Sequence, residues 1–251
     1  MLPLFWPLLL IALPVALLGA LFKLPAVKGW TGEAWMRLLM QWRLPAADYQ
    51  RVDDVTLPSM DGSTQIDHIL LSRYGVFVIE TKNMAGWIFG DEHQAQWTQQ
   101  LYRRRYRFQN PLRQNYRHLK AVQQALALEE NQLHSVVNFI GSSTFKTPMP
   151  AHVTQGGGFL TYIQGFKTAV FTPEDVAVLR TRLQQARLAP GHTTRQQHLA
   201  HLQQRHDPQA QRQCPRCGQA LVLRTASKGT QRGKRFWGCS AYPRCRTRQD
   251  L

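Results

Sequence analysis

The sequence predicts a globular protein of the α/β or α+β class, because strand-like and helix-like segments follow one another along the chain instead of being segregated. Apolar, β-branched runs at residues 66–71, 75–82 and 135–141 are typical of strands. Residues 110–130 repeat apolar side chains with the period of a helix. With 251 residues and 43% hydrophobic composition, the chain can form one or two domains with a core, which excludes a disordered protein.

The charge of the chain indicates a polyanionic partner. The net charge is +16, and the sequence pI is about 10.4. Residues 195–251 hold 12 basic and 2 acidic side chains, so the last fifth of the chain carries most of the excess. Such a balance favours nucleic acid or an anionic membrane surface as the partner.

The first 23 residues predict a membrane anchor. Leu2 to Phe22 is apolar throughout and long enough to cross a bilayer core. A cleaved signal peptide and a buried core helix are the alternatives, but no basic region precedes the run and three prolines interrupt it. Basic residues follow the run, so we expect a single-pass protein with its body in the cytoplasm, in the inner membrane of a bacterium.

Three further segments have patterns that predict secondary structure. Residues 34–40 suggest a short amphipathic helix capped by Thr31, which would place Glu33 in the first turn, where a carboxylate stabilises the helix end. Residues 156–163 suggest a strand after three glycines. Residues 172–188 begin with Thr-Pro-Glu-Asp, a typical helix start.

The central observation is a predicted hairpin with charged residues at the end of apolar strands. Glu80 and Lys82 lie on one face of residues 75–82, and Asp67 can lie beside them on residues 66–71. Burying such groups is unfavourable unless they are paired or bind a metal. A salt-bridged strand pair and a metal site are both compatible with this pattern.

Basic residues near this hairpin suggest phosphate contacts. Residues 103–108 interleave four arginines with two aromatic residues, which suits backbone phosphates and stacked bases but also fits a solvated loop or an edge strand. Basic residues and Gln114 fall largely off the apolar stripe of the helix that follows, so they could contact a phosphodiester. The alternative is that they form an ordinary solvated face of the helix. The candidate contact residues here are Arg103, Arg104, Arg105, Arg113 and Arg117.

The four cysteines of the chain all lie near its end, at 214, 217, 239 and 245. Two closely spaced pairs can close a tetrahedral thiolate site for Zn²⁺, and a small module with little core needs such a metal. Two disulfides are the alternative, which a cytoplasmic location disfavours. We expect a Gln- and His-rich basic linker at residues 190–212 and a zinc module at 213–251.

The segment from about Gly29 to Ile163 resembles a nuclease-related (NERD) domain. The resemblance rests on Gly32-Glu33, on Thr64-Gln65-Ile66-Asp67-His68-Ile69, on Gly75 to Asn83 with its Ile79-Glu80-Thr81-Lys82, on Gly86, and on Asn110-Pro111-Leu112-Arg113-Gln114. It implies the restriction-endonuclease-like fold of the PD-(D/E)xK superfamily, with a mixed central sheet flanked by helices, for a domain at residues 24–189. The sequence departs from the superfamily motif in having Ile66 where a proline often precedes the aspartate.

This resemblance implies a role for each residue that matches a motif. Asp67 and Glu80 would bind Mg²⁺ or Mn²⁺, and Lys82 would be the catalytic lysine. Glu33 would be an auxiliary carboxylate from the first helix, and Gln114 would line the site.

The C-terminal segment resembles the four-cysteine zinc finger of type IA topoisomerases. The matching residues are Cys214-Pro215-Arg216-Cys217-Gly218, Phe236-Trp237-Gly238-Cys239-Ser240 and Tyr242-Pro243-Arg244-Cys245. The resemblance implies DNA binding, preferentially to single strands. Arg235, Phe236, Trp237 and Tyr242 are the candidate contacts, because aromatic rings among cations can stack bases.

Together these predictions describe a membrane-anchored, metal-dependent DNA endonuclease with a zinc-binding tail. The alternative from another class is a catalytically weak or inactive protein that tethers DNA at the membrane. A nuclease directed at RNA is a third hypothesis.

Overall fold

A computed structural model describes residues 25–59, 62–189, 191, 196, 200, 212–214, 216–227, 232–233 and 235–250. Its contacts divide the chain into two compact units, one built mainly from residues before 186 and the other from the C-terminal part with residues 56–65. The predicted anchor at residues 1–23 lies outside the described residues. Among the helices that are described, none combines the length and the apolar composition that a membrane crossing requires.

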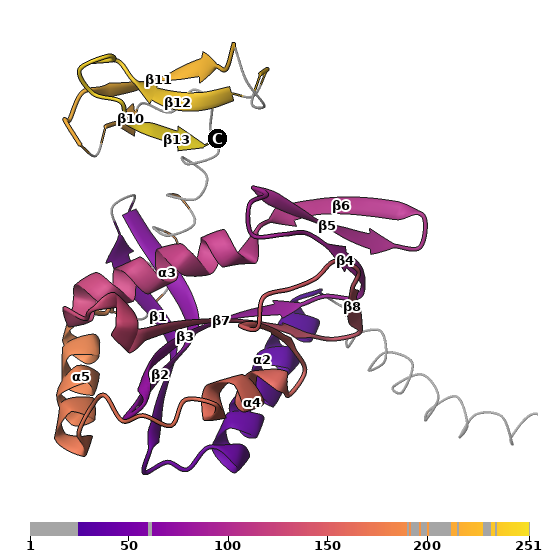
Figure 1. The fold of residues 1–251 in the computed structure, drawn as a ribbon, viewed down its shortest axis with the longest axis vertical. Coiled ribbons are helices and arrows are strands. Elements are labelled where there is room, and N and C mark those ends of the chain that lie inside the picture. Colours follow the sequence, from indigo (N-terminus) through magenta and orange to yellow (C-terminus); the bar gives the residue numbers. More distant parts are fainter. Residues whose placement is uncertain are drawn as a thin grey trace, which may run out of the picture. The chain divides into compact units, whose positions relative to one another are not determined.

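A mixed five-stranded sheet forms the centre of the larger unit (Figure 1). β2 and β3 pair antiparallel, whereas β3 pairs parallel to β7 and β7 parallel to β9. These directions confirm the predicted mixed sheet. In sheet order the strands are β1 (Tyr49–Ser59), β2 (Gly62–Ser72), β3 (Gly75–Asn83), β7 (Leu133–Ile140) and β9 (Val153–Gln155).

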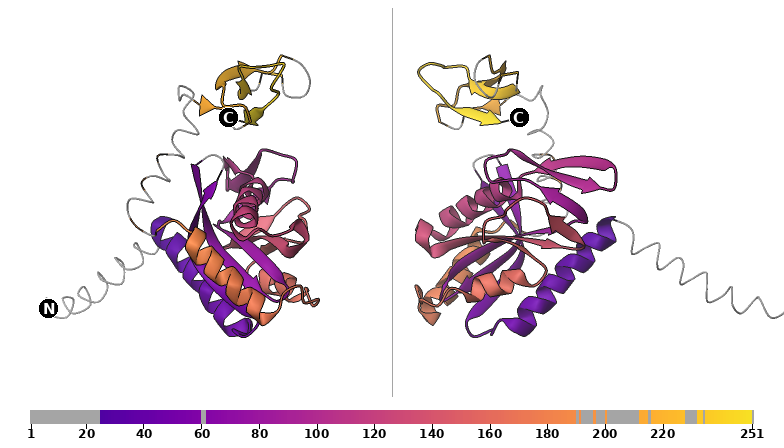
Figure 2. Two further views of the ribbon diagram at one scale, coloured as in Figure 1. Left: turned by 90° about the vertical axis from the view of Figure 1, so that its left-hand side faces the viewer. Right: turned by 45° about the vertical axis from the view of Figure 1, so that its right-hand side comes forward.

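Helices cover both faces of this sheet, with α2 (Pro25–Arg43) and α3 (Pro111–Leu126) on opposite sides of the strands (Figure 2). Phe77 and Ile79 of β3 pack in one cluster with residues of α2 and of α4 (Gly158–Gln164). The alternate residues of β3, which include Glu80 and Lys82, therefore face α3. Two further elements are the 3₁₀ turn Glu130–Gln132 and α5 (Pro173–Ala186).

Two sequence predictions about these helices are wrong. α2 begins at Pro25, so Thr31 lies inside the helix instead of capping it, and Glu33 lies well beyond its first turn. Proline is favoured at the first helical position, which allows this earlier start. The predicted strand at residues 156–163 is instead α4, because Phe159, Leu160 and Ile163 are buried with helical spacing.

Three strands of a second sheet lie in the chain between β3 and α3, and its fourth strand, β8, follows β7. The sheet has the order β6-β5-β4-β8, and its inner face packs through Ile88 and Trp97 against Phe139 of β7. The rings of Trp97 and Phe139 are stacked, with centroids 6.1 Å apart. The strands are β4 (Gly86–Phe89), β5 (Gln96–Leu101), β6 (Arg104–Gln109) and β8 (Ser143–Phe145).

The C-terminal unit contains a small antiparallel sheet. Its core is formed by three cysteines with Leu221 and Trp237, so the module has few apolar side chains of its own. The strands, in sheet order, are β10 (Arg212–Gln213), β11 (Ala220–Thr225), β12 (Arg235–Cys239) and β13 (Arg248–Asp250).

Candidate active site and metal centre

The β2–β3 hairpin brings Asp67 and Glu80 face to face. His68 pairs with Ile79 in the antiparallel register, which places Asp67 opposite Glu80 on the adjacent strand. Glu80 is 3% exposed. The backbone N–H of Thr81 donates to Oδ2 of Asp67 over 2.8 Å, which orients this carboxyl toward the end of β3.

Lys82 joins the hairpin to α3. Its Nζ donates to Oε1 of Glu80 over 2.6 Å and to Oε1 of Gln114 over 2.9 Å. Gln114 is in the first turn of α3, where Asn110 caps the helix by accepting a hydrogen bond from the N–H of Leu112 over 2.9 Å. The structure thus brings together Asp67, Glu80, Lys82 and Gln114 as the sequence predicted.

His118 belongs to the same cluster and was missed from sequence. Its Nε2 lies 3.1 Å from Oε2 of Glu80, and the residue is 4% exposed. The available signal was its position four residues after Gln114, because residues separated by four share one face of a helix. Both carboxylate oxygens of Glu80 therefore have a partner, Lys82 on one side and His118 on the other.

The two carboxyl groups have opposite shifts in acidity. Burial, followed by the nearby charge of Glu80, raises the pKa of Asp67 to about 8. Burial also opposes ionisation of Glu80, but the hydrogen bond from His118 and the charge of Lys82 outweigh it and hold the pKa of Glu80 below its usual value. At neutral pH the pair therefore holds one proton and one negative charge.

Glu33 lies near this pair but has a separate partner. Its charge contributes to the raised pKa of Asp67, so the two carboxyl groups are close enough to interact. Partial burial and then Asp54 raise the pKa of Glu33 itself. Its Oε2 lies 3.5 Å from Nη2 of Arg37, one turn further along α2. Because Glu33 is well inside α2, stabilisation of the helix terminus does not explain it.

The residues present fit a divalent cation. Asp67 retains a proton mainly because the site is buried and already holds a second carboxylate, and a cation between the two groups would remove that repulsion. Carboxylate oxygens are the ligands that Mg²⁺ and Mn²⁺ prefer. Coordination by Glu80 requires one of its oxygens to be shared with, or released by, Lys82 or His118.

The predicted basic contacts of the larger unit are spread over two elements. Arg103 is at the tip of the β5–β6 hairpin, and Arg104 and Arg105 are exposed on β6. Arg113 is exposed on α3 and donates from Nη2 to the carbonyl of His93 over 2.7 Å. Arg117, also on α3, is half-buried.

The four cysteines form the one cluster of potential metal ligands found among the described residues. Their sulfur atoms all lie within 4.8 Å of one another, and no disulfide joins them. Sγ of Cys214 is 3.6 Å from Sγ of Cys245, and Sγ of Cys217 is 3.4 Å from Sγ of Cys239. Four ligands at Zn–S distances of 2.3 Å in a tetrahedron have sulfur separations of about 3.8 Å, so this donor set fits Zn²⁺.

The aromatic residues of this module separate into core and surface. Trp237 is 3% exposed and packs with the cysteines, so its main role is in the core of the module. Tyr242 is 60% exposed, with the guanidinium of Arg224 5.8 Å from its ring centroid. Phe236 lies under the guanidinium of Arg248 at 4.5 Å, and Arg235 is exposed beside it.

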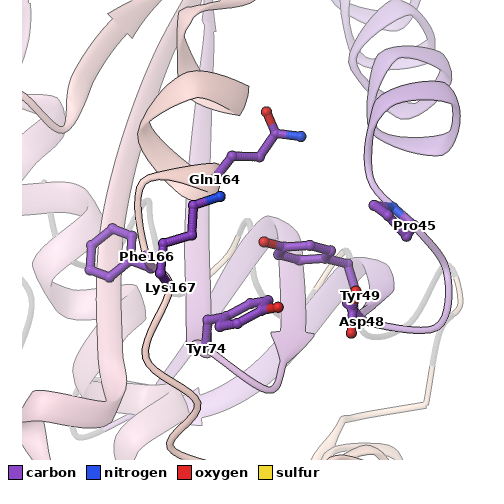
Figure 3. A pocket seen from close by; sticks show the side chains of 7 residues that line it. All are labelled: Pro45, Asp48, Tyr49, Tyr74, Gln164, Phe166 and Lys167. Carbon is purple, nitrogen blue, oxygen red and sulfur yellow. The ribbon is translucent and has the colours of Figure 1, made fainter.

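One pocket of the larger unit, of 330 Å³, contains none of these residues (Figure 3). The rings of Tyr49 and Tyr74 lie on one side of it, and the side chains of Gln164 and Lys167 on another. Its lining holds one carboxylate, Asp48, and none of the residues that contact Glu80, so it is separate from the candidate active site.

Comparison with known proteins agrees with this division of the chain. Residues 28–140 match the family model of the nuclease-related domain, and residues 211–251 match the model of the topoisomerase DNA binding C4 zinc finger. An uncharacterized protein of Bacillus anthracis is 42% identical over 122 residues, which are 48% of this chain and 57% of that protein. No solved structure gives a significant match.

The family matches cover the two regions in which the structure assembles polar site residues. The first holds the carboxylate pair and Lys82, and the second holds the four cysteines. These features suggest a DNA-binding, nuclease-like protein with a zinc site. The chain contains a nuclease-related domain followed by a topoisomerase-type C4 zinc finger.

Proposed function

We propose that this protein is a metal-dependent DNA endonuclease that hydrolyses phosphodiester bonds. The observation that carries the proposal is the position of Lys82, whose ammonium group bridges Glu80 and Gln114 beside the facing carboxyl of Asp67. A salt bridge that only stabilises two strands needs one cationic and one anionic side chain. Here a second carboxyl, that of Asp67, lies opposite the first and has a pKa of about 8.

Asp67 and Glu80 would hold the divalent ion. When bound, such an ion polarises a phosphoryl oxygen and lowers the pKa of a water molecule. The ammonium group of Lys82 orients the attacking water and stabilises the negative charge that develops on the phosphoryl oxygens. Gln114 fixes the position of that ammonium, and His118 holds the carboxylate of Glu80 in place.

The zinc finger, in this proposal, delivers the nucleic acid. Its net positive charge and the exposed ring of Tyr242 suit single-stranded DNA. We further propose that the apolar N-terminal segment anchors the protein in a bacterial inner membrane, with the nuclease-related domain in the cytoplasm.

A protein that only tethers DNA is the second candidate, and one observation favours it. Lys82 and His118 already occupy both oxygens of Glu80, an arrangement that a structural ion pair would also adopt. In that case the domain would bind DNA without cleaving it.

Cleavage assays on matched substrates separate these candidates. The full-length protein is incubated with single-stranded DNA, duplex DNA and RNA of one sequence, with Mg²⁺, with Mn²⁺ or with EDTA. The endonuclease proposal predicts internal cuts in DNA that EDTA prevents. Tight binding with intact products under every condition would support the tether, and preferential cleavage of RNA would contradict the assignment of DNA.

A further inference from the structure

The outer face of the second sheet has an unusual composition. Trp87 of β4 pairs with Gln100 of β5, which pairs with Arg105 of β6, so these three side chains form one row across the sheet. The next row on the same face contains Thr98 and Arg107. We call this surface the Trp87 face, defined by Trp87, Thr98, Gln100, Arg105, Arg107 and Lys146, the residue that follows β8.

The inner face of the same sheet is buried, which fixes the direction of the outer one. Ile88 and Trp97 are fully buried, and Phe108 packs against them. Because successive side chains of a strand point to opposite faces, the neighbours of these residues point away from the core. Accordingly, Trp87 is 48% exposed, and Arg105 and Arg107 are exposed.

One cation lies over the exposed indole, and arginine side chains share its face of the sheet. Nζ of Lys146 lies 4.6 Å from the ring centroid of Trp87, and in the same row across the sheet Nε of Arg105 donates to Oε1 of Gln100 over 3.2 Å. None of the four strands of this sheet contains an acidic residue. The face therefore combines a large exposed ring with positive charge and no nearby strand carboxylate to offset it.

From this arrangement we propose that the Trp87 face binds single-stranded DNA. An unpaired base stacks on the indole of Trp87, and the flanking phosphates are neutralised by Arg105, Arg107 and Lys146. Bases in a duplex are already stacked on their neighbours, so an exposed ring on a sheet face selects an unpaired strand. This proposal deepens the proposed function, on which it rests, by assigning a substrate-binding surface within the nuclease-related domain itself.

The chain connects this face directly to the candidate active site. Trp87 follows Lys82 by five residues, a distance of at most about 17 Å of extended chain. At the other end, β6 leads into Asn110, the cap of α3, whose Nδ2 donates to the carbonyl of Gln94 over 2.7 Å. The sheet is thus fixed to both elements that carry the active-site residues, and a strand bound on the Trp87 face lies within reach of Lys82.

Photo-crosslinking tests the proposal directly. The full-length Lys82→Ala protein, which is expected to leave DNA intact, is irradiated with a bromodeoxyuridine-containing single strand, and the crosslinked peptides are mapped. We expect a crosslink at Trp87 in addition to those in the zinc finger. The double substitution Arg105→Gln and Arg107→Gln should reduce the yield at Trp87 roughly tenfold in low salt, because two phosphate contacts are lost, and leave the zinc-finger crosslinks unchanged.

Matched variants and competing ligands test whether single-stranded DNA is the ligand of the Trp87 face. Trp87→Ala should weaken single-strand binding by roughly tenfold, Trp87→Phe should retain most of it, and Trp42→Ala, which removes another exposed tryptophan, should have no effect. Crosslinks confined to the zinc finger would overturn the proposal, as would displacement of the single strand by duplex DNA, RNA or anionic vesicles at lower concentration. Because Lys82→Ala is used throughout, these outcomes are independent of whether the wild type cleaves.

Discussion

At the scale of single residues, the proposed chemistry depends on the different states of two neighbouring carboxyl groups. Glu80 is ionised because Lys82 and His118 both contact it, whereas Asp67 accepts a hydrogen bond from the backbone N–H of Thr81 and is influenced by Lys82 only through its charge. The pair therefore has one negative charge without a metal. A bound divalent cation would be balanced by two negative charges, because both carboxyl groups would then be ionised. This imbalance is a physical property of the metal-free protein, and it can be measured without any nuclease assay.

The raised pKa of Asp67 predicts a specific loss of stability with pH. Between its ordinary value of 3.8 and about 8, the folded protein retains a proton that the unfolded chain has released. The free energy of unfolding therefore falls as pH rises through this window, by up to about 1.4 kcal/mol per pH unit, and is recovered below the lower value. Asp67→Asn removes this dependence.

The measurement is thermal unfolding of both proteins in EDTA at a series of pH values. The Tm of Asp67→Asn should exceed that of the wild type by an amount that grows from pH 4 to pH 8. Glu130→Gln, at a side chain that is 78% exposed, is the control and should run parallel to the wild type. A constant difference between Asp67→Asn and wild type would contradict the account of this site.

His118 is expected to act through Glu80. His118→Ala leaves Oε2 of Glu80 without its hydrogen-bond partner, so we expect a 10–100-fold loss of divalent-ion affinity or activity, as is typical when the support of a metal ligand is removed. His118→Gln, whose amide can also donate, should recover part of this loss. Titration with Mn²⁺, monitored by its paramagnetic effect on water relaxation, measures the affinity. Equal binding by His118→Ala and wild type would show that His118 has only a packing role.

At the scale of elements, α3 is fixed to the sheet by a buried amide. Asn115 is fully buried, and its Nδ2 donates to the carbonyl of Val78 over 2.9 Å and to Oγ of Ser135 over 2.8 Å. These contacts set the distance between α3 and the strands β3 and β7. They thereby set where Gln114 and His118 meet the ends of the strands.

Asn115→Ala should therefore destabilise the domain. The substitution removes the buried donor, leaves its former acceptors without that hydrogen bond and opens a small cavity. The expected loss is about 2–3 kcal/mol in the free energy of unfolding. Urea unfolding of the full-length protein measures the change. Gln124→Ala, at an exposed position of the same helix, should change stability by less than about 0.5 kcal/mol. A similar small effect at both positions would mean that the amide does not fix α3.

The sequence was most informative where local chemistry alone determines structure. Asn110-Pro111 begins α3 as predicted, because a capping side chain and a proline at the first position act within one turn. The β2–β3 hairpin was equally clear from its alternating and apolar residues. Its register, once known, was sufficient to bring Asp67 opposite Glu80.

The predictions that are wrong or incomplete share one cause, because they depend on tertiary packing between segments that are distant in the sequence. The sequence predicts a strand at residues 156–163, but packing of that segment against the central sheet selects a helix. The role of His118 depends on how α3 rests on β3, a distance that no sequence pattern gives. Likewise, the sequence predicts that Trp237 stacks on bases, but the small core of the zinc module buries it.

At the scale of the whole molecule, the chain joins a nuclease-related domain to a module with a very small core. Five buried residues, three of them cysteines, make up the core of the C-terminal module. Such a core cannot offset the loss of chain entropy without a metal. The zinc module should therefore be folded only when zinc is bound.

Metal analysis of the purified protein should return about one zinc per chain, given the single four-sulfur cluster. Cys239→Ser should abolish zinc binding and flatten the salt dependence of DNA binding, because the basic side chains of the module are no longer held together. Emission spectrometry and binding titrations over a range of salt concentrations provide the two measurements. An unchanged salt slope in a zinc-free variant would show that the module is not the DNA contact.

The most direct test of the central claim is nicking of a supercoiled plasmid in Mg²⁺ by the wild type and by Lys82→Ala. Lys120→Ala, on α3 but outside the carboxylate cluster, serves as the control for loss of one positive charge. If the cluster is an active site, wild type and Lys120→Ala convert the plasmid to open circles. Lys82→Ala does so at least about 100-fold more slowly, although it binds DNA as tightly as the wild type. Equal rates for wild type and Lys82→Ala, or intact plasmid with every protein, would contradict the account.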